Sequence, residues 1–209
     1  MSCLKRCVIV GGADINNYEY INSILREDDY LIFCDSGLKH KSKIKISPSL
    51  IVGDFDSHEQ IDTDVETIVL PCEKDDTDTV YAMKEGIKRG YDNFLLIGVV
   101  GARFDHSFVN ISILLNLYKL GFKAELVDDY SVMSVVGDSP AEITDNYSYF
   151  SLLNITGKSN GVSITNAKYT LDNAEIKSEY QYATSNEVLK GKVATVSVKD
   201  GVLLLIKVF

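Results

Sequence analysis

Two short segments rich in aspartate are the most chemically suggestive part of this 209-residue sequence. The first is Gly53-Asp-Phe-Asp-Ser57, in which Asp54 and Asp56 alternate. Alternate residues of an extended segment point the same way, so both carboxylates could share one cation. A small set of hard oxygen ligands suits Mg²⁺, which keeps several of its waters and bridges to phosphates. The same residues are also compatible with a turn in which the aspartates bond the local backbone.

The second acidic segment is Lys74-Asp-Asp-Thr-Asp78, at the start of a predicted helix. Asp and Thr are favourable helix caps, and carboxylates complement the positive end of the helix dipole. Capping explains one or two of these acids. Three acids in four residues repel one another unless a cation or strong donors lie among them, and Lys74 supplies only part of that charge. We therefore expect Asp75, Thr77 and Asp78 to serve a ligand.

A third segment, Gly101-Ala-Arg-Phe-Asp-His106, leads into a long predicted helix. The planar guanidinium of Arg103 suits a phosphate. Asp105 could cap the helix, orient Arg103 or bind a metal. We expect His106 to be a hydrogen-bonded packing residue and Asn110, one turn later, to fix a loop.

Strand-like and helix-like segments alternate through the first part of the chain. Predicted strands cover residues 7–10, 30–34, 50–52, 65–70, 94–99 and 122–127, and predicted helices cover 16–27, 77–89 and 104–120. The first helix should face inward through Tyr20 and Ile24, with Tyr18, Ile21 and Leu25 as further candidates for that side, and the third carries an apolar stripe of Phe104, Phe108, Ile111, Leu115 and Tyr118. Such alternation indicates a mainly parallel sheet with helices on its faces.

The chemically suggestive residues each follow a different predicted strand. In chain order they are Asp14, Asp35, Asp54, Asp78 and Arg103. In an open α/β sheet these positions lie at the carboxyl edge, where such folds bind ligands. The sequence therefore predicts one ligand site at that edge.

After residue 130 the pattern becomes strand-rich. Strand-like runs cover 131–136, 149–155, 162–164, 193–198 and 202–208, and Asp200-Gly201 predicts a hairpin between the last two. We expect an α/β domain over residues 1–130, followed by a small all-β sandwich or barrel over residues 131–209.

Composition excludes several classes of function. The net charge of −9 disfavours a nucleic-acid partner, and the apolar runs are too short for a membrane span. The four cysteines form no C-x-x-C pair, which indicates reduced thiols in a cytoplasmic protein. The dinucleotide-binding and P-loop fingerprints are both absent.

The ordered set of motifs resembles the thiamine pyrophosphokinase family over nearly the whole chain. The motifs are Gly11-Gly12, Cys34-Asp-Ser-Gly37, Pro48-Ser-Leu-Ile-Val-Gly-Asp-Phe-Asp-Ser57, Lys74-Asp-Asp-Thr-Asp78, Gly101-Ala-Arg-Phe-Asp-His106 with Asn110, Ala167-Lys-Tyr-Thr-Leu171 and Thr184-Ser-Asn-Glu187. The resemblance implies diphosphoryl transfer from ATP to the hydroxyethyl oxygen of thiamine, which gives AMP and thiamine diphosphate. It also implies an α/β catalytic domain, a C-terminal β-sandwich, and a homodimer with thiamine at the subunit junction.

The resemblance assigns roles by position. Asp54, Asp56 and Asp78 would hold Mg²⁺, and Asp78 is also the candidate acceptor of the thiamine hydroxyl proton. Arg103 and Asp105 would position the ATP phosphates. The remaining expected nucleotide and phosphate contacts are Asp35, Gly37, Lys74, Asp75 and Thr77, and the expected thiamine contacts are Tyr169, Ser185 and Asn186. The sequence departs from the family pattern at Ala102, at Asn166-Ala167 and in having no Trp.

Two other functions are compatible with parts of the pattern. Asp54-Phe-Asp56 after a strand superficially fits the nucleophile motif of a Mg²⁺-dependent phosphohydrolase, although His58 stands where those enzymes keep Thr or Val. A non-catalytic nucleotide-sensing module, with the β-rich part for a protein partner, is the other alternative.

Overall fold

The computed structural model describes residues 5–55, 64–73, 75–101 and 103–209. The chain divides into two compact units, Met1–Asp129 and Tyr130–Phe209. The paired strands within the first unit are parallel, and those within the second unit are antiparallel.

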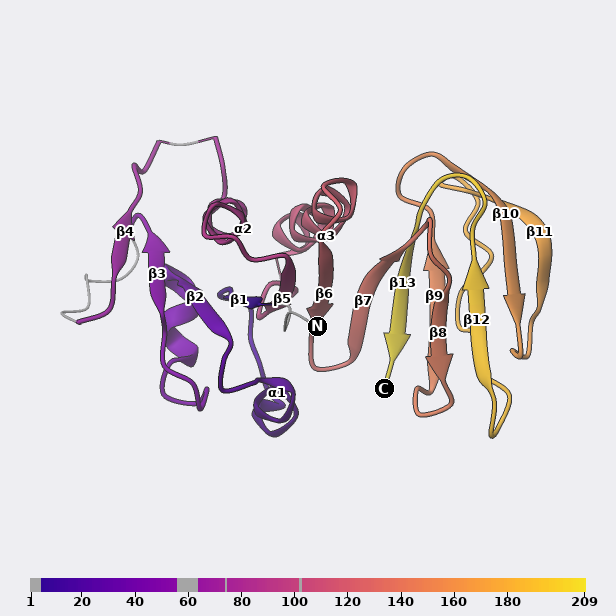
Figure 1. The fold of residues 1–209 in the computed structure, drawn as a ribbon, viewed down its shortest axis with the longest axis horizontal. Coiled ribbons are helices and arrows are strands. Elements are labelled where there is room, and N and C mark those ends of the chain that lie inside the picture. The colour runs from indigo at the N-terminus through magenta and orange to yellow at the C-terminus, as the bar shows by residue number, and fades with distance from the viewer. Residues whose placement is uncertain (1–4, 56–63, 74, 102) are drawn as a thin grey trace. The chain divides into compact units, whose positions relative to one another are not determined.

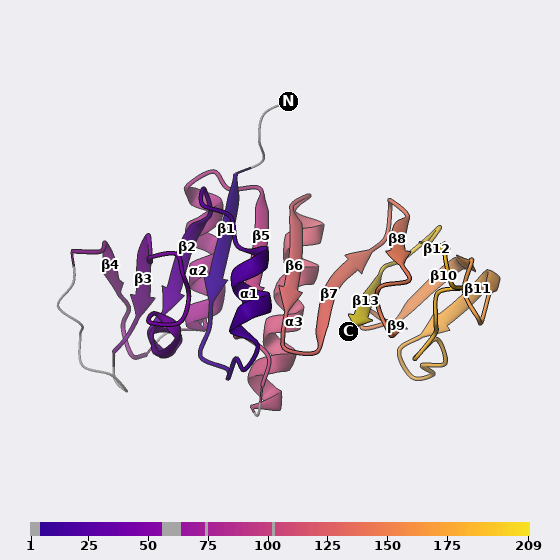
Figure 2. The same ribbon diagram turned by 90° about the horizontal axis from the view of Figure 1, so that it is seen from below.

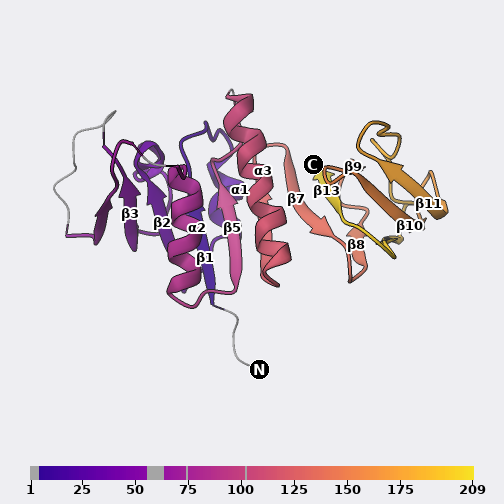
Figure 3. The same ribbon diagram turned by 90° about the horizontal axis from the view of Figure 1, so that it is seen from above.

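Unit 1 (Met1–Asp129) is an α/β unit with a six-stranded parallel sheet of order β4-β3-β2-β1-β5-β6. The strands are β1 (Arg6–Val10), β2 (Tyr30–Cys34), β3 (Leu50–Gly53), β4 (Thr67–Val69), β5 (Asn93–Ile97) and β6 (Lys123–Val127). The central strands are near-continuous apolar runs because helices cover both faces of the sheet. Helix α1 (Tyr18–Ile24) lies on one face, and α2 (Asp78–Lys88) and α3 (Phe104–Lys119) lie on the other (Figures 1, 2 and 3). A short 3-10 helix, η1 (Asp35–His40), follows β2.

Helix α1 is shorter than the 16–27 segment that the sequence predicts. The side chain of Asn17 caps it by accepting a hydrogen bond from the Tyr20 backbone N–H at 3.1 Å. Its buried side is formed by Ile21 and Leu25, which the sequence offered as further candidates for the inner face, whereas Tyr20 and Ile24 are only half-buried.

The predicted apolar stripe of α3 was wrong. Phe104 and Phe108 are 77% and 56% exposed, and the buried apolar side chains are Ile113, Leu114 and Leu117. The helix is apolar around much of its circumference, so periodicity could not choose the buried face. Polar Ser107 and Asn110 on the buried face mark the side that meets the sheet.

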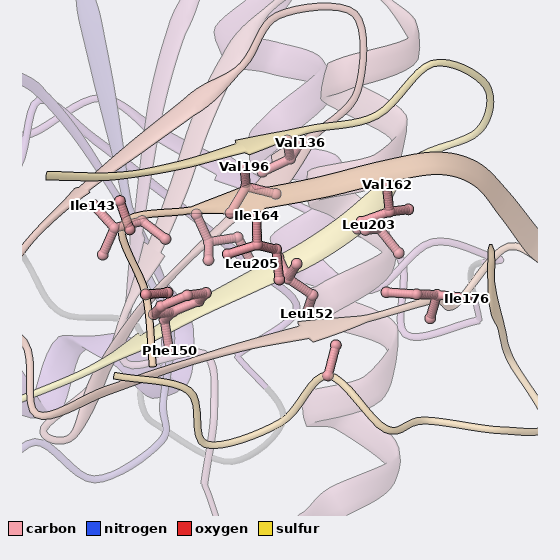
Figure 4. Close-up of a cluster of buried hydrophobic side chains, with 13 residues drawn as sticks. Val136, Ile143, Phe150, Leu152, Val162, Ile164, Ile176, Val196, Leu203 and Leu205 are labelled. Atoms are coloured by element: carbon pink, nitrogen blue, oxygen red, sulfur yellow. The ribbon is translucent and has the colours of Figure 1, made fainter. Parts of the chain in front are cut away.

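Unit 2 (Tyr130–Phe209) contains two antiparallel sheets, of order β7-β13-β9 and β11-β10-β12-β8. The strands are β7 (Ser131–Val136), β8 (Ala141–Thr144), β9 (Tyr149–Leu153), β10 (Lys158–Thr165), β11 (Leu171–Lys177), β12 (Val193–Ser197) and β13 (Leu203–Val208). One buried cluster takes side chains from both sheets, for example Phe150 and Leu205 from the first and Ile143 and Ile164 from the second (Figure 4). Two sheets that share one core form a sandwich. The predicted fold class, a parallel α/β unit followed by an all-β unit, is confirmed.

The sequence did not predict strands β8 and β11, and the hairpin that it predicted at Asp200-Gly201 was wrong. Both strands lie at the edges of the second sheet, where few positions are buried and alternation is weak. Asp200-Gly201 does not close a hairpin, because β12 and β13 belong to different sheets and the turn carries the chain from one to the other.

Two smaller features concern the cysteines and the helices. Among the cysteines that the structure describes, Cys7 and Cys34 are buried and Cys72 is exposed. In the described parts of the chain, every helix falls short of the length and hydropathy that a membrane span requires.

Candidate active site

The strand order of unit 1 reverses between β1 and β5, and the loops that follow these two strands meet there. The Gly11 N–H donates to the Ile97 carbonyl oxygen at 2.9 Å, and the Ala13 N–H donates to that of Gly98 at 2.7 Å. A Cβ at Gly11 would lie 2.6 Å from the Gly98 oxygen, so this approach requires glycine. Open α/β sheets bind ligands at such a reversal point, outside the carboxyl ends of the strands.

A cavity of about 460 Å³ opens at this point. Its wall takes residues 11–14 after β1, Ser36 and Lys39 of η1, residues 77–79 at the start of α2, and the loop after β5 with the first turns of α3. Segments that follow β1, β2, β4 and β5 therefore line one cavity, whereas Asp54, which follows β3, is not among its described lining residues.

The amino terminus of α2 faces the cavity. Thr77 caps the helix by accepting the Val80 N–H on its hydroxyl at 3.3 Å, and Asp78 begins the first turn. Thr77, Asp78 and Thr79 all line the cavity. The first backbone N–H groups of a helix and its dipole attract anions such as phosphate, while the Asp78 carboxylate can receive a cation.

Arg103 and Asp105 form a two-point ion pair at the start of α3. Nε of Arg103 lies 3.0 Å from Oδ1 of Asp105, and Nη2 lies 2.7 Å from Oδ2. The guanidinium holds the pKa of Asp105 well below its usual range. Arg103 lines the cavity and both side chains are more than half exposed, so a phosphate can reach the remaining guanidinium N–H groups.

Two polar residues of α3 fix the loop after β5. The buried Asn110 amide donates to the Val99 carbonyl oxygen at 2.7 Å. The Ser107 hydroxyl accepts the Gly101 N–H at 3.0 Å and donates to the Arg103 carbonyl oxygen at the same distance. The prediction that Asn110 fixes a loop is confirmed, and Ser107 joins it in that role.

His106 is not the packing residue that the sequence led us to expect. Its side chain is 57% exposed and lines the cavity. It lies in the first turn of α3.

Lys39 is a cavity residue that sequence reasoning missed. Its Nζ lies 2.7 Å from Oδ1 of Asp14, and this contact lowers the pKa of Asp14. The signal was its position one turn after Asp35-Ser-Gly37 in a basic segment, but only the 3-10 conformation of η1 brings it to the cavity.

The other predicted site residues that the structure describes are not among those that line this cavity. Asp35 is buried and packs over Gly53, and Gly37 is buried against the Val10 carbonyl oxygen. Asp54 is half-exposed just after β3, and Asp75 is exposed before α2. Asp56 and Lys74 lie outside the described residues.

The carboxylates at this edge have the chemistry that a hard divalent cation needs. Asp78 lines the cavity, and Asp54 follows β3 at the same carboxyl edge of the sheet. Within the described residues, no three acidic, histidine or cysteine side chains gather into a metal-binding group. Two carboxylates with water and phosphate oxygens suit Mg²⁺, which seldom takes an all-protein set of ligands.

The predicted thiamine residues lie in unit 2. The Tyr169 side chain is exposed, whereas Asn186 is buried. The Asn186 amide oxygen accepts the Tyr169 N–H at 3.0 Å, and its Nδ2 donates to the Tyr169 carbonyl oxygen at 2.7 Å. Ser185 has a positive φ of 52°, and its N–H donates to the Ser151 hydroxyl at 3.0 Å. Asn186 therefore shapes the backbone that presents Tyr169.

The fold and the cavity define an open α/β protein with a polar-lined cavity at the strand reversal, followed in the chain by a β-sandwich. The catalytic-domain model of the thiamin pyrophosphokinase family matches residues 21–126, and its vitamin B1 binding domain matches residues 141–203. The chain belongs to the thiamine pyrophosphokinase family, which is a family of enzymes.

Relatives match along almost the full chain. The thiamine pyrophosphokinase of Bacillus subtilis is 28% identical over 98% of this chain and 99% of its own. The crystal structure of the thiamin pyrophosphokinase from Geobacillus thermodenitrificans is 25% identical, with a TM-score of 0.83 over 98% of this chain and 97% of that one. A Bacillus subtilis crystal structure, 24% identical with a TM-score of 0.86 over 98% and 99%, shows the same fold.

Proposed function

We propose that this protein transfers the diphosphoryl group of ATP to thiamine. The observation that carries the proposal is the cavity at the strand reversal, where the amino terminus of α2, Asp78 and Arg103 face one space. The family membership favours this function over the phosphohydrolase and the sensing module.

The step joins the thiamine hydroxyethyl oxygen to the β-phosphorus of ATP. The bond between that phosphorus and the oxygen bridging to the α-phosphorus breaks, and AMP leaves with the bond's electron pair. The hydroxyl proton passes to a carboxylate, for which Asp78 is the candidate. Phosphoryl transfer asks a protein mainly for positioning and charge neutralisation.

The proposed site residues divide these tasks. Arg103, oriented by Asp105, binds phosphate oxygens, and the N–H groups near Thr77 bind them through the helix terminus. Asp54 and Asp78, with Asp56, would hold Mg²⁺. A bound Mg²⁺ neutralises phosphate charge and orients the oxygens. Asp35 and Gly37 shape the nucleotide end, and Lys74 and Asp75 support the phosphate segment.

Thiamine binding is proposed for the surface around Tyr169, Ser185 and Asn186. The exposed Tyr169 ring offers a face to the cationic thiazolium, an arrangement that is favourable where water is excluded. We further propose that the protein is a homodimer with thiamine at the subunit junction, and that it works in the cytoplasm, where ATP is available.

Product analysis tests the proposed function. Purified protein is incubated with ATP, Mg²⁺ and thiamine, and the products are separated. Equal amounts of thiamine diphosphate and AMP are expected, and neither without thiamine. Release of inorganic phosphate without thiamine would support the phosphohydrolase, and bound nucleotide without any product would support the sensing module.

A further inference from the structure

Lys39 is held at the cavity by a rigid backbone. Its neighbours Leu38 and His40 are 6% and 2% exposed, so the segment that carries it is anchored on both sides. The His40 Nε2–H donates to the Ala13 carbonyl oxygen at 2.9 Å, and the Tyr18 hydroxyl lies 2.7 Å from its Nδ1. These bonds tie η1 both to the loop after β1 and to α1.

The partner of Lys39 is exchangeable. The Asp14 side chain is 85% exposed and that of Lys39 is 40% exposed. Ion pairs in such exposed positions contribute little net free energy, so a more highly charged anion can replace Asp14 at small cost.

Lys39 and Arg103 flank the site from opposite sides. η1 follows β2 and α3 follows β5, and these two strands lie on either side of β1. Lys39 and Arg103 are the two Lys or Arg residues among the described residues of the cavity wall. The chain has a net charge of −9, so a polyphosphate that carries about four negative charges needs local cations to enter.

We propose that Lys39 is a phosphate-binding residue that exchanges Asp14 for the polyphosphate of the nucleotide. Asp14 then pairs with the Lys39 ammonium only while no nucleotide is bound. This inference rests on the proposed function for the identity of the nucleotide, but it concerns binding and not transfer.

Binding of Mg²⁺-loaded α,β-methylene-ATP to the full-length protein, measured by calorimetry, tests the proposal. Lys39→Met should raise the dissociation constant about tenfold, the scale of one hydrogen bond to a charged group. Lys39→Arg should restore most of the affinity. Lys41→Met, two residues along the same segment, should stay within about twofold of the wild type because Lys41 is only half-buried and does not line the cavity.

Asp14→Asn separates ligand exchange from a structural ion pair. If Asp14 is a placeholder, its removal should leave the dissociation constant unchanged or lower it. If the pair only stabilises the wall, Asp14→Asn should weaken binding as Lys39→Met does, which would overturn the proposal. Adenosine, which has no phosphate, should bind all variants equally, and an equal loss for adenosine would also overturn it.

Steady-state kinetics keep this inference distinct from the proposed function. Lys39→Met should raise KM for ATP and leave KM for thiamine unchanged. If the wild type forms thiamine diphosphate but Lys39→Met binds the analogue as tightly as the wild type, only the role of Lys39 is refuted. If Lys39→Met weakens analogue binding but the wild type forms no thiamine diphosphate, the role of Lys39 is supported and only the proposed transfer is refuted.

Discussion

Unit 1 and unit 2 use their polar side chains in opposite ways. At the cavity of unit 1, Lys39 and Arg103 have exposed acidic partners that a ligand can replace or share. In unit 2 the polar groups described here bond within the fold: the buried Asn154 amide donates to the Ser159 hydroxyl at 2.7 Å, and Asn186 bonds the Tyr169 backbone. The charged groups of the first unit are available for a ligand, whereas those amides hold the second unit together.

The difference follows from strand direction. Parallel strands all end at one edge, so the loops after them gather in one place, and the reversal between β1 and β5 leaves room for a cavity there. Antiparallel strands place their ends alternately at both edges, so no single edge collects the loops. The cavity of unit 1 is therefore built from loops, whereas the polar amides named above in unit 2 stabilise its fold.

The largest expected effect is on the core of unit 2. Phe150 is 1% exposed and lies between the two sheets (Figure 4). Phe150→Ala should lower the free energy of unfolding by about 3–5 kcal/mol, because it removes buried apolar surface and leaves a cavity. Chemical denaturation measures this loss. Tyr149→Ala, next along the strand and 46% exposed, should cost less than about 1 kcal/mol, and equal costs would contradict a sandwich core at Phe150.

Two buried asparagines give a direct test of the comparison between the units. Asn110→Ala and Asn186→Ala should each destabilise the protein by about 1–3 kcal/mol, because each leaves buried backbone groups without a partner. Their kinetic effects should differ: Asn110→Ala raises KM for ATP by loosening the loop after β5, and Asn186→Ala raises KM for thiamine.

Asn116→Ala is the matched control for this pair. Asn116 is exposed on α3, so its replacement should change stability by less than about 0.5 kcal/mol. If both buried asparagines raised KM for the same substrate, the division of tasks between the units would be wrong.

A smaller effect concerns pH. Burial lowers the pKa of His40, so the folded protein favours its neutral form. This contribution to stability is complete above the unfolded pKa of about 6.5 and is lost as pH falls through that value toward the lower folded pKa. The wild type should lose stability over this range more steeply than His40→Gln, by at most about 1.4 kcal/mol per pH unit. Thermal unfolding from pH 7.5 to 5 measures the difference, and parallel curves would contradict a neutral, buried His40.

The central strands of unit 1 and the carboxyl edge of its sheet could be predicted from the sequence. The edge strands of unit 2 and the buried face of α3 could not. β1, β2 and β5 are buried on both faces, so their apolar runs end sharply and the polar residues that follow mark the carboxyl edge. β8 and β11 escaped prediction because edge strands bury few side chains. The buried face of α3 was predicted wrongly because hydrogen bonds of two polar residues, Ser107 and Asn110, to the loop after β5 fix the orientation of the helix.

The sequence predicted which motifs belong to the site, but it did not predict how their side chains are arranged. Sequence spacing indicated Asp78 and Arg103, which the structure brings to one cavity. It could not indicate Lys39, because that residue reaches the wall only through the 3-10 conformation of η1. The assignments of Asp54, Asp56 and Asp78 to the metal, and of Tyr169, Ser185 and Asn186 to thiamine, remain predictions.

One pair of variants tests most directly whether the reaction takes place at the carboxyl edge of unit 1. Asp78 lines the cavity, whereas Asp76, two residues earlier, pairs with Lys84 at 2.5 Å and is not a cavity residue. The rate of thiamine diphosphate formation should fall by roughly two to three orders of magnitude in Asp78→Asn, the scale of losing one preorganised charge at the reacting phosphates. Asp76→Asn should keep nearly the wild-type rate, and both variants should unfold at wild-type temperatures. Near-normal turnover in Asp78→Asn, or an equal loss in both variants, would contradict the account.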